Sequence, residues 1–423
     1  MLHADNPEIR SLLLKGNFGL EKESLRVDGT GRFSHTPHPF PGCKNIVRDF
    51  GENQVEINTG TQPTPAAVIA ELDRYNAEVQ RTLRDLPERE YLWPSSNPPV
   101  IINENDIPIA QFEGELAYKT VYREHLSHRY GRYKMTFSGI HFNYSFADEL
   151  LEADFKLSEY DDFRTYKDQL YIALTERAVA YGWIMTALTA ASPVMDMSYV
   201  EKGADNKDLF MGFATVRCSE LGYWNVFAPV FDYTDVASYA DSIERYVAQG
   251  LIKYPSELYY PVRLKPPGEN TPEGLRERGV SHIELRMFDL NPLRRTGIEV
   301  KDVFFAQLLL VWLASTPRRP LALKDQVQAI QNFKNAARYD LQTVKIVVPD
   351  GRSMTVVDAA LDVIELMEEF YGDFNPEVTE CLRFQKEKFI HPETRYAWQI
   401  RQQAEAGFAQ RALKLAKDYQ ARY

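Results

Sequence analysis

The chain has 423 residues, of which 44% are hydrophobic and 12% aromatic, and its formal net charge at pH 7 is −11. This apolar content is sufficient for a sizeable core, in one large domain or in two to three ordinary ones. The negative charge argues against nonspecific binding to nucleic acids or anionic membranes, which require basic patches. Three widely separated cysteines, no signal-peptide pattern and no apolar run long enough to span a bilayer predict a cytoplasmic protein without disulfides.

The first part of the chain is predicted to alternate strands with helices. We expect a short helix at 6–15, a strand at 20–27, a loop at 29–41, a strand at 53–59 and a loop rich in proline and asparagine at 94–108. The clearest helix signal is Thr64 as N-cap, followed by Pro65 at the first helical position. Apolar residues then recur at helical spacing, which predicts an amphipathic helix over 65–85.

The later part of the chain is predicted to be mainly helical. We expect a long buried helix at 164–191, a mobile charged loop at 197–210, helices at 239–249 and 303–315, a hairpin or strand end at 344–348, and helices from 355 onward that end with 397–423. Short strands separated by long helical segments favour an α+β fold with a mixed or antiparallel sheet.

Five short stretches place an acid, a histidine or an arginine on one side of a predicted strand. They are GLEKESLRV with Glu21 and Glu23, RDFGENQVEIN with Asp49 and Glu56, FSGIHFNYSF with His141, ATVRCSELGY with Arg217, and SHIELRMFDLNP with Glu284 and Arg286. Successive strand residues point to opposite faces, so Glu21 and Glu23 share a face, and His141 lies opposite an apolar face. A sheet with this pattern forms either a solvated surface or a metal-lined cavity.

Carboxylates that are brought close together repel one another and raise one another's pKa, and a cation compensates this cost. Oxygen ligands with one imidazole are compatible with Mg²⁺ or Mn²⁺, and Mg²⁺ binds mainly where substrate phosphates share its coordination shell. Arg217 and Arg286 suit phosphate or carboxylate oxygens. The chemistry thus favours a metal–nucleotide site, and the alternative is a set of ordinary solvated strand faces. No GxxxxGK[ST] and no GxGxxG after a strand is present, which disfavours P-loop and Rossmann enzymes.

Nine segments, in order over about residues 12–315, resemble the bacterial type of glutamate–cysteine ligase, whose catalytic module also forms the first half of fused glutathione-synthesising enzymes. They are FGLEKESLRV, DFGENQVEI, YLWPSSNPP, VYREHLSHRYG, SGIHFNYSF, ASPVM, VRCSELGY, ELYYPVR and IELRMFDLNP. The resemblance implies a glutamine-synthetase-like funnel of strands with helices outside it. It also implies that ATP phosphorylates the γ-carboxyl of L-glutamate and that the amine of L-cysteine attacks the acyl phosphate, with Mg²⁺ or Mn²⁺ as cofactor.

The resemblance also implies roles for individual residues. The positions that match metal ligands are Glu21, Glu23, Asp49, Glu56, His141 and Glu284. Arg286 matches a phosphate-facing arginine, and Arg217 an arginine at the centre of the substrate and nucleotide site. The positions that match the lining of the cysteine pocket are Phe50, Tyr122, Leu126, Tyr223 and Tyr259. His125 and His128 have a spacing that suits metal on a helix, but they match no family ligand, and we expect them to bind none.

Two departures from the family pattern matter. Met135 stands where the family usually has glutamine beside the acceptor pocket, which puts acceptor preference in doubt. No second ATP-binding module follows, so only the first step of glutathione biosynthesis is expected.

We expect a catalytic core at 1–330 and a mostly helical extension at 331–423 packed on it, with small-molecule substrates, no nucleic acid and no membrane as partners. A monomer is compatible with the sequence. The alternatives are a ligase that joins glutamate to another amine, and a non-catalytic homologue.

Overall fold

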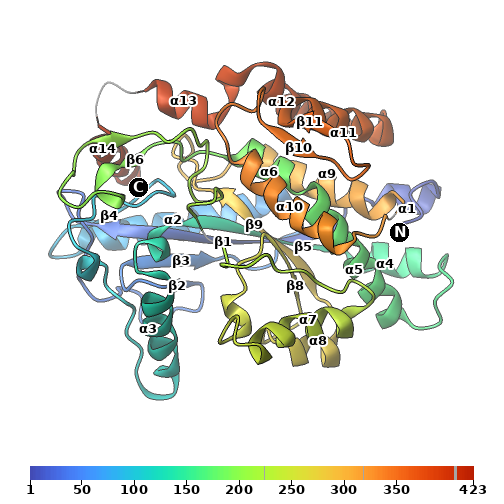
Figure 1. Ribbon diagram of the computed structural model, residues 1–423, viewed down its shortest axis with the longest axis horizontal. Coiled ribbons are helices and arrows are strands. Elements are labelled where there is room, and N and C mark those ends of the chain that lie inside the picture. Colours follow the sequence, from blue (N-terminus) through green and yellow to red (C-terminus); the bar gives the residue numbers. More distant parts are fainter. Residues whose placement is uncertain (223, 318, 404–406) are drawn as a thin grey trace.

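A seven-stranded antiparallel sheet lies at the centre of the protein, in a computed structural model that describes residues 1–222, 224–317, 319–403 and 407–423 (Figure 1). Its strands are β1 (Gly16–Val27), β2 (Ile46–Arg48), β3 (Gln54–Asn58), β4 (Tyr91–Leu92), β5 (Gly139–Phe146), β8 (Val262–Lys265) and β9 (His282–Asp289). Six of them follow the order β2-β3-β1-β5-β9-β8, and β4 pairs with the end of β1. Two short hairpins lie outside this sheet: β6 (Met195–Asp196) with β7 (Asp208–Leu209), and β10 (Lys345–Val347) with β11 (Ser353–Thr355).

Fourteen α-helices form in the described part of the chain, and they surround the sheet (Figure 1). They are α1 (Pro7–Leu12), α2 (Pro65–Asp85), α3 (Tyr118–Tyr130), α4 (Asp148–Phe155), α5 (Phe163–Tyr181), α6 (Trp183–Thr189), α7 (Val236–Ala248), α8 (Pro272–Arg278), α9 (Val300–Ser315), α10 (Leu323–Ala336), α11 (Val356–Tyr371), α12 (Pro376–Ile390), α13 (Tyr396–Gln402) and α14 (Phe408–Gln420). Short 3-10 turns are η1 (Glu104–Asp106), η2 (Gly114–Leu116), η3 (Lys134–Thr136), η4 (Met197–Tyr199), η5 (Pro255–Glu257) and η6 (Pro392–Thr394). The predicted α+β class with an antiparallel sheet is confirmed.

One face of the sheet is apolar and packs against helices. Alternate residues of β5 are buried on it, namely Ile140, Phe142, Tyr144 and Phe146. The backbone N–H of Phe146 donates a hydrogen bond to the hydroxyl of Tyr171 on α5, at 3.0 Å. Lys22 of β1 points to the same side and donates to Asn76 of α2, at 2.8 Å. Since side chains alternate along a strand, the polar side chains of β1 and β5 lie on the face away from these helices.

Several predicted elements are confirmed with their local signals. Helix α2 covers the residues that the periodicity predicts, and the Thr64 hydroxyl accepts the hydrogen bond of the Ala67 N–H at 3.1 Å, as expected of an N-cap. The strands at 20–27 and 53–59 are β1 and β3. The helices at 239–249 and 303–315 are α7 and α9, and the hairpin at 344–348 is β10 with β11.

Other predictions were wrong in detail. The single helix expected at 164–191 is two helices, α5 and α6, which meet at Gly182. A Cβ at Gly182 would overlap the Ala178 carbonyl and the ring of Phe333, so the glycine allows α10 to approach closely. The helix expected at 397–423 is divided into α13 and α14, and the loop expected at 197–210 contains η4 and β7.

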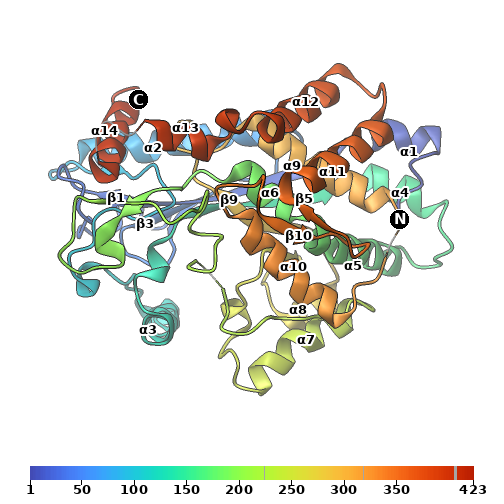
Figure 2. The same ribbon diagram turned by 45° about the horizontal axis from the view of Figure 1, so that its top comes forward.

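The C-terminal helices lie across the side of the sheet opposite α3, α7 and α8 (Figure 2). A buried ion pair of 2.8 Å joins Lys388 of α12 to Asp302 of α9, and the Tyr396 hydroxyl of α13 donates to the same carboxylate at 2.9 Å. A boundary after residue 330 would fall inside α10, and the division into core and extension stays a prediction. Within the described residues, no helix combines the length and the apolar character needed to cross a membrane.

Candidate metal centre and active-site cavity

The register of the sheet gathers acidic side chains and a histidine on the polar face. Glu21 of β1 is paired with His141 of β5, and Glu23 of β1 with Glu56 of β3. Directly opposite residues of an antiparallel pair have Cβ atoms about 4.5–5.5 Å apart, so these side chains are neighbours. Three strands that are distant in sequence thus contribute to one polar surface.

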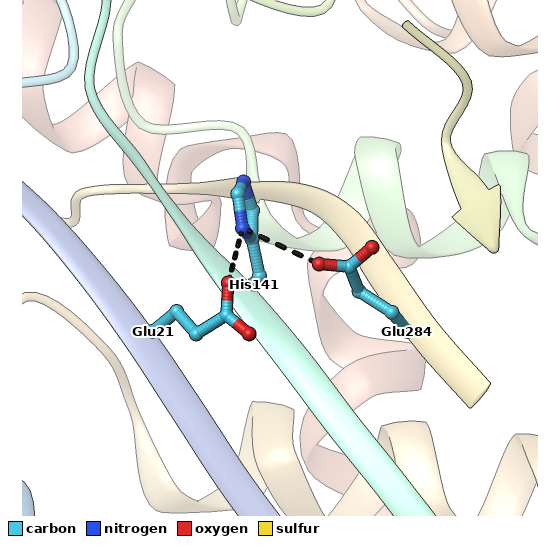
Figure 3. Close-up of side chains that lie close together, drawn as sticks. All are labelled: Glu21, His141 and Glu284. Atoms are coloured by element: carbon cyan, nitrogen blue, oxygen red, sulfur yellow. Dashed lines mark hydrogen bonds and ion pairs between the residues drawn. The ribbon is translucent and has the colours of Figure 1, made fainter. Parts of the chain in front are cut away.

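Glu21, His141 and Glu284 form a cluster of possible metal ligands from β1, β5 and β9 (Figure 3). One ligand atom from each residue lies within 4.8 Å of the other two. His141 Nδ1 lies 2.9 Å from Glu21 Oε2 and 3.6 Å from Glu284 Oε1. Among the described residues, the buried atoms His141 Nε2 and Glu284 Oε2 have no hydrogen-bond partner. Buried polar atoms are normally partnered, so this donor set fits a hard divalent cation that accepts oxygen and imidazole ligands.

Cations of the protein surround this cluster. Glu284 is 0% exposed, and Arg286 Nη1 and Lys265 Nζ lie 2.9 Å and 3.3 Å from its Oε1. Burial opposes the charge of Glu284, but Arg286 and Lys265 hold the pKa of this carboxyl well below its usual range. Burial and the nearby Arg286 lower the pKa of His141, which keeps the imidazole in the neutral form that binds a metal.

Glu23, Asp49 and Glu56 form a second acidic group beside the first. His141 connects the two groups, because its Nε2 lies 3.6 Å from Glu23 Oε1. Burial, and then the charge of Asp49, raise the pKa of Glu23 well above its usual value. The same two causes raise the pKa of Glu56 to about 8. Without a cation, protons offset the repulsion in this group, and a divalent cation would take their place.

The raised pKa of Glu56 predicts how the stability of the metal-free protein changes with pH. Its pKa is near 4.5 in the unfolded chain and about 8 in the folded protein. The folded state therefore holds this proton more tightly, and stability falls as the pH rises from 4.5 through 8. We expect Glu56→Gln to reduce this fall. Urea unfolding at several pH values in EDTA measures it, and an equal fall in both proteins would contradict the pKa of Glu56.

Arg217 lies in a turn, so its predicted position on a strand was wrong. The turn is held by Asp289 of β9, whose carboxylate accepts a hydrogen bond from the Thr215 hydroxyl at 2.9 Å. The Arg217 guanidinium is buried against the backbone of Gly139, where a Cβ would overlap it. Its Nη1 donates to the Phe288 carbonyl at 3.4 Å. The fold thus brings Arg217 to the polar face without a strand.

One cavity of about 280 Å³ joins the acidic groups to both arginines. The predicted site residues that line it are Glu21, Glu23, Asp49, Phe50, Glu56, Tyr122, Leu126, Met135, His141, Arg217, Tyr259 and Arg286. Glu284 does not line it, because this side chain is fully buried beneath the surface. Tyr223 lies outside the described residues.

Part of the cavity wall is apolar and aromatic. Phe50, Leu126 and Met135 are buried in one hydrophobic cluster, with Tyr122 and Tyr259 packed against it. Burial raises the pKa of the Tyr122 hydroxyl to about 12, so it stays protonated at neutral pH. Such a pocket suits a small, partly apolar substrate group held by a few hydroxyls.

Arg123, Cys218 and Trp224 also line the cavity, although no sequence motif assigned them to the site. Arg123 Nε donates to the Asp49 carbonyl at 2.5 Å, and its cationic group lies close to two of the acids. The sequence signal that could have identified Arg123 is its position directly after Tyr122, which was predicted to line the pocket. Cys218 follows Arg217, and burial raises the pKa of its thiol to about 11, which keeps it protonated.

Comparison with known proteins gives a consistent family. A family model described as glutamate-cysteine ligase matches residues 2–336. The chain is 35% identical to the glutathione biosynthesis bifunctional protein GshAB of Listeria monocytogenes, over 98% of this chain and 56% of the relative. It is 30% identical to GshAB of Clostridium perfringens, over 97% of this chain and 55% of the relative. The chain thus spans about half the length of these curated relatives.

Two solved structures have a similar fold. A bifunctional glutathione synthetase from Pasteurella multocida gives a TM-score of 0.83 at 27% identity and covers 98% of this chain and 53% of its own. A glutamate–cysteine ligase from Francisella tularensis, solved in complex with AMP, gives a TM-score of 0.86 at 23% identity and covers 96% of this chain and 89% of its own. The second comparison supports the fold alone.

Proposed function

The chain belongs to the glutamate–cysteine ligase family, and on this premise we propose that it joins the γ-carboxyl group of L-glutamate to the amine of L-cysteine with consumption of ATP. In this reaction ATP phosphorylates the γ-carboxyl, and the amine displaces phosphate from the acyl phosphate. The products are γ-glutamylcysteine, ADP and phosphate, which is the first step of glutathione biosynthesis. We also propose a cytoplasmic location and a catalytic core at 1–330 with a helical extension after it.

The observation that carries this proposal is the cluster of Glu21, His141 and Glu284 beside Arg286 at one cavity. We propose that Mg²⁺, or Mn²⁺ in its place, is held by the six predicted ligands, Glu21, Glu23, Asp49, Glu56, His141 and Glu284. A bound divalent cation would neutralise phosphate charge and polarise phosphoryl oxygens. The carboxylates then need not hold protons, and neutral His141 supplies a nitrogen ligand.

The two arginines suit the anionic groups of the substrates. Arg286 Nη1 lies between Glu284 Oε1 at 2.9 Å and His141 Nδ1 at 3.3 Å, so its guanidinium is fixed next to the proposed metal ligands. From there Arg286 would face the transferring phosphoryl group, where positive charge stabilises the transition state. Arg217 lies at the same cavity and would bind carboxylate or phosphate oxygens.

The apolar and aromatic part of the cavity wall is the proposed acceptor pocket. Its proposed contacts to L-cysteine are Phe50, Tyr122, Leu126, Met135, Tyr223 and Tyr259. Aromatic and aliphatic side chains suit the small thiol side chain, and tyrosine hydroxyls can bind its carboxylate. This pocket and the proposed ligands Glu21 and His141 line one cavity, so the amine would lie close to the activated γ-carboxyl.

A direct assay tests the proposed function. The protein is incubated with ATP, Mg²⁺, L-glutamate and each of the common amino acids, and products are identified by mass. We expect γ-glutamylcysteine with release of ADP and phosphate. Efficient turnover with a different amine alone would instead identify a related glutamate–amine ligase, which the apolar Met135 allows. No ATP turnover with any amine would favour a non-catalytic homologue.

Met135 is expected to weaken discrimination between cysteine and 2-aminobutyrate, in which a methyl group replaces the thiol. Met135 is 2% exposed and packs in the apolar cluster, where glutamine would add donors and an acceptor. Without a specific polar partner, an isosteric competitor is rejected by only about 1–3 kcal/mol. We expect Met135→Gln to change the ratio of kcat/KM for the two amines. A native preference above about a thousandfold, or an unchanged ratio in Met135→Gln, would show that position 135 does not select the acceptor.

A further inference from the structure

Helix α3 forms one wall of the proposed acceptor pocket, and packing alone holds it weakly. It contributes Tyr122 and Leu126 to the cavity. Leu126 is the buried residue of this 13-residue helix, and Figure 1 shows the helix projecting away from the C-terminal helices. A helix with so little buried surface opens easily unless specific contacts hold it.

The opposite wall is built around Glu257 at the end of η5. The Glu257 carboxylate is 0% exposed, and its Oε1 accepts the backbone N–H groups of Lys253 at 3.0 Å and Tyr254 at 3.1 Å. The Glu257 carbonyl accepts a hydrogen bond from Asn225 Nδ2 at 2.8 Å, and Asn225 Oδ1 accepts the N–H of Tyr259 at 2.8 Å. The position of Glu257 therefore determines the position of Tyr259, which lines the cavity.

An imidazole and a guanidinium of α3 reach this buried carboxylate. His125 Nε2 lies 3.2 Å from Glu257 Oε1, and Arg129 Nη1 lies 3.7 Å from Glu257 Oε2. His125 and Arg129 are one helical turn apart and so share a face of α3. Within the described residues, Arg129 and His125 supply the basic nitrogens that lie within 4.0 Å of the Glu257 carboxylate. A buried carboxylate is costly unless it is paired, so the pairing favours one position of α3.

Aromatic contacts run beside this ion pair and couple the two walls directly. The rings of Tyr122 and Tyr254 meet edge to face with centroids 5.3 Å apart. The rings of Tyr130, the last residue of α3, and Tyr259 lie 5.4 Å apart. A shift of α3 would therefore move the walls of the pocket relative to each other.

We propose that His125, Arg129 and Glu257 form a clamp that sets the width of the acceptor pocket. None of the three lines the cavity, so they are positioning residues that act through Tyr122, Leu126 and Tyr259. The inference rests on the proposed function, because it assigns the pocket between α3 and η5 to the amine substrate. It predicts that the clamp affects acceptor binding more than ATP binding, because Arg123 of α3 still donates to the Asp49 carbonyl beside the proposed metal ligands when the clamp is lost.

Steady-state kinetics of His125→Gln, Glu257→Gln and the double variant test the clamp. We expect KM for the acceptor amine to rise about tenfold, which corresponds to about 1.4 kcal/mol, a cost within the range for an unpaired buried group. KM for ATP and kcat should stay within about twofold. Because the two residues act through each other, the double variant should resemble one single variant. Equal changes in KM for ATP and the acceptor, an unchanged acceptor KM, or additive effects would overturn the clamp.

His128→Gln is the matched control. His128 lies on the same helix and is exposed, and its Nδ1 contacts the Glu124 carbonyl of its own helix at 2.7 Å. This variant makes the same change of residue type without touching Glu257, so we expect native kinetics. A similar rise in acceptor KM in His128→Gln would show that general loss of α3 helicity, and not the clamp, is responsible.

Hydrogen–deuterium exchange of residues 118–130 in the unliganded protein tests the clamp without any turnover. We expect faster exchange in His125→Gln and Glu257→Gln, and native exchange in His128→Gln. Unchanged exchange in all three would overturn the clamp even if the protein is an active ligase. Faster exchange in a protein that forms no γ-glutamylcysteine would leave the clamp standing and reject the proposed function.

Discussion

Glu284→Gln is expected to abolish most turnover, with a loss on the order of a hundredfold to a thousandfold at saturating Mg²⁺. Glu284 is the fully buried member of the cluster with Glu21 and His141, and its Oε2 has no hydrogen-bond partner among the described residues. The amide keeps the shape but removes the charge that would bind the metal and hold Arg286. Glu21→Gln and Glu56→Gln are also expected to lose turnover, because each removes a charge that would bind the metal.

The same variants should differ in the stability of the metal-free protein. Glu284→Gln leaves Arg286 and Lys265 without their buried partner, so we expect a loss of about 3–5 kcal/mol. Glu56→Gln removes an acid that is repelled by Asp49, so we expect a small gain at pH above 8. Urea unfolding in EDTA measures both. Near-native turnover of all three variants at saturating Mg²⁺ would reject the metal assignment.

Arg286→Lys is expected to lower kcat much more than it raises KM for ATP. Lysine keeps the positive charge but loses the planar guanidinium, which can hold two oxygens at once. If Arg286 acts on the phosphoryl group during transfer, the loss belongs to the transition state and amounts to about 2–4 kcal/mol, or roughly thirtyfold to a thousandfold in kcat.

Arg177→Lys is a matched control for the loss of a buried guanidinium. Arg177 lies away from the cavity and donates to the carbonyls of Leu313 and Thr316 at the end of α9. We expect it to lower stability and leave kcat close to the native value. An unchanged kcat with weaker ATP binding in Arg286→Lys would make Arg286 a contact to bound nucleotide in the ground state.

Sequence patterns predicted those helices and strands that depend on interactions between residues close together in the sequence. Thr64 and Pro65 define the start of α2 through one capping hydrogen bond and one fixed backbone angle. The alternation at 140–146 placed His141 on the polar face of β5, as observed. The break at Gly182 has a tertiary cause, the approach of Phe333 from α10, and the apolar periodicity before and after it carries no sign of that contact.

In the candidate site, too, some residues could be predicted from the sequence and others are placed only by tertiary contacts. Residue types and strand faces singled out the acidic residues, His141 and both arginines, and the family resemblance added the acceptor-pocket residues; the described ones line or underlie one cavity. Arg217 reaches that cavity from a turn held by Asp289 and Thr215, which strand patterning cannot predict. The exposed-looking EHLSH segment carried no sign that His125 pairs with Glu257, because that partner lies far later in the chain.

The sequence by itself determined the fold class, the polar and apolar faces of β1 and β5, and the types of ligand available for metal and phosphate. These follow from covalent geometry, since side chains alternate along any strand and oxygen ligands suit hard cations wherever they occur. The tertiary structure alone decided that Glu21 faces His141 and Glu23 faces Glu56, that Glu284 is buried with Arg286, and that α3 is held against η5. Register and burial depend on pairings between distant segments, and their free energies are sums over contacts that no local pattern contains.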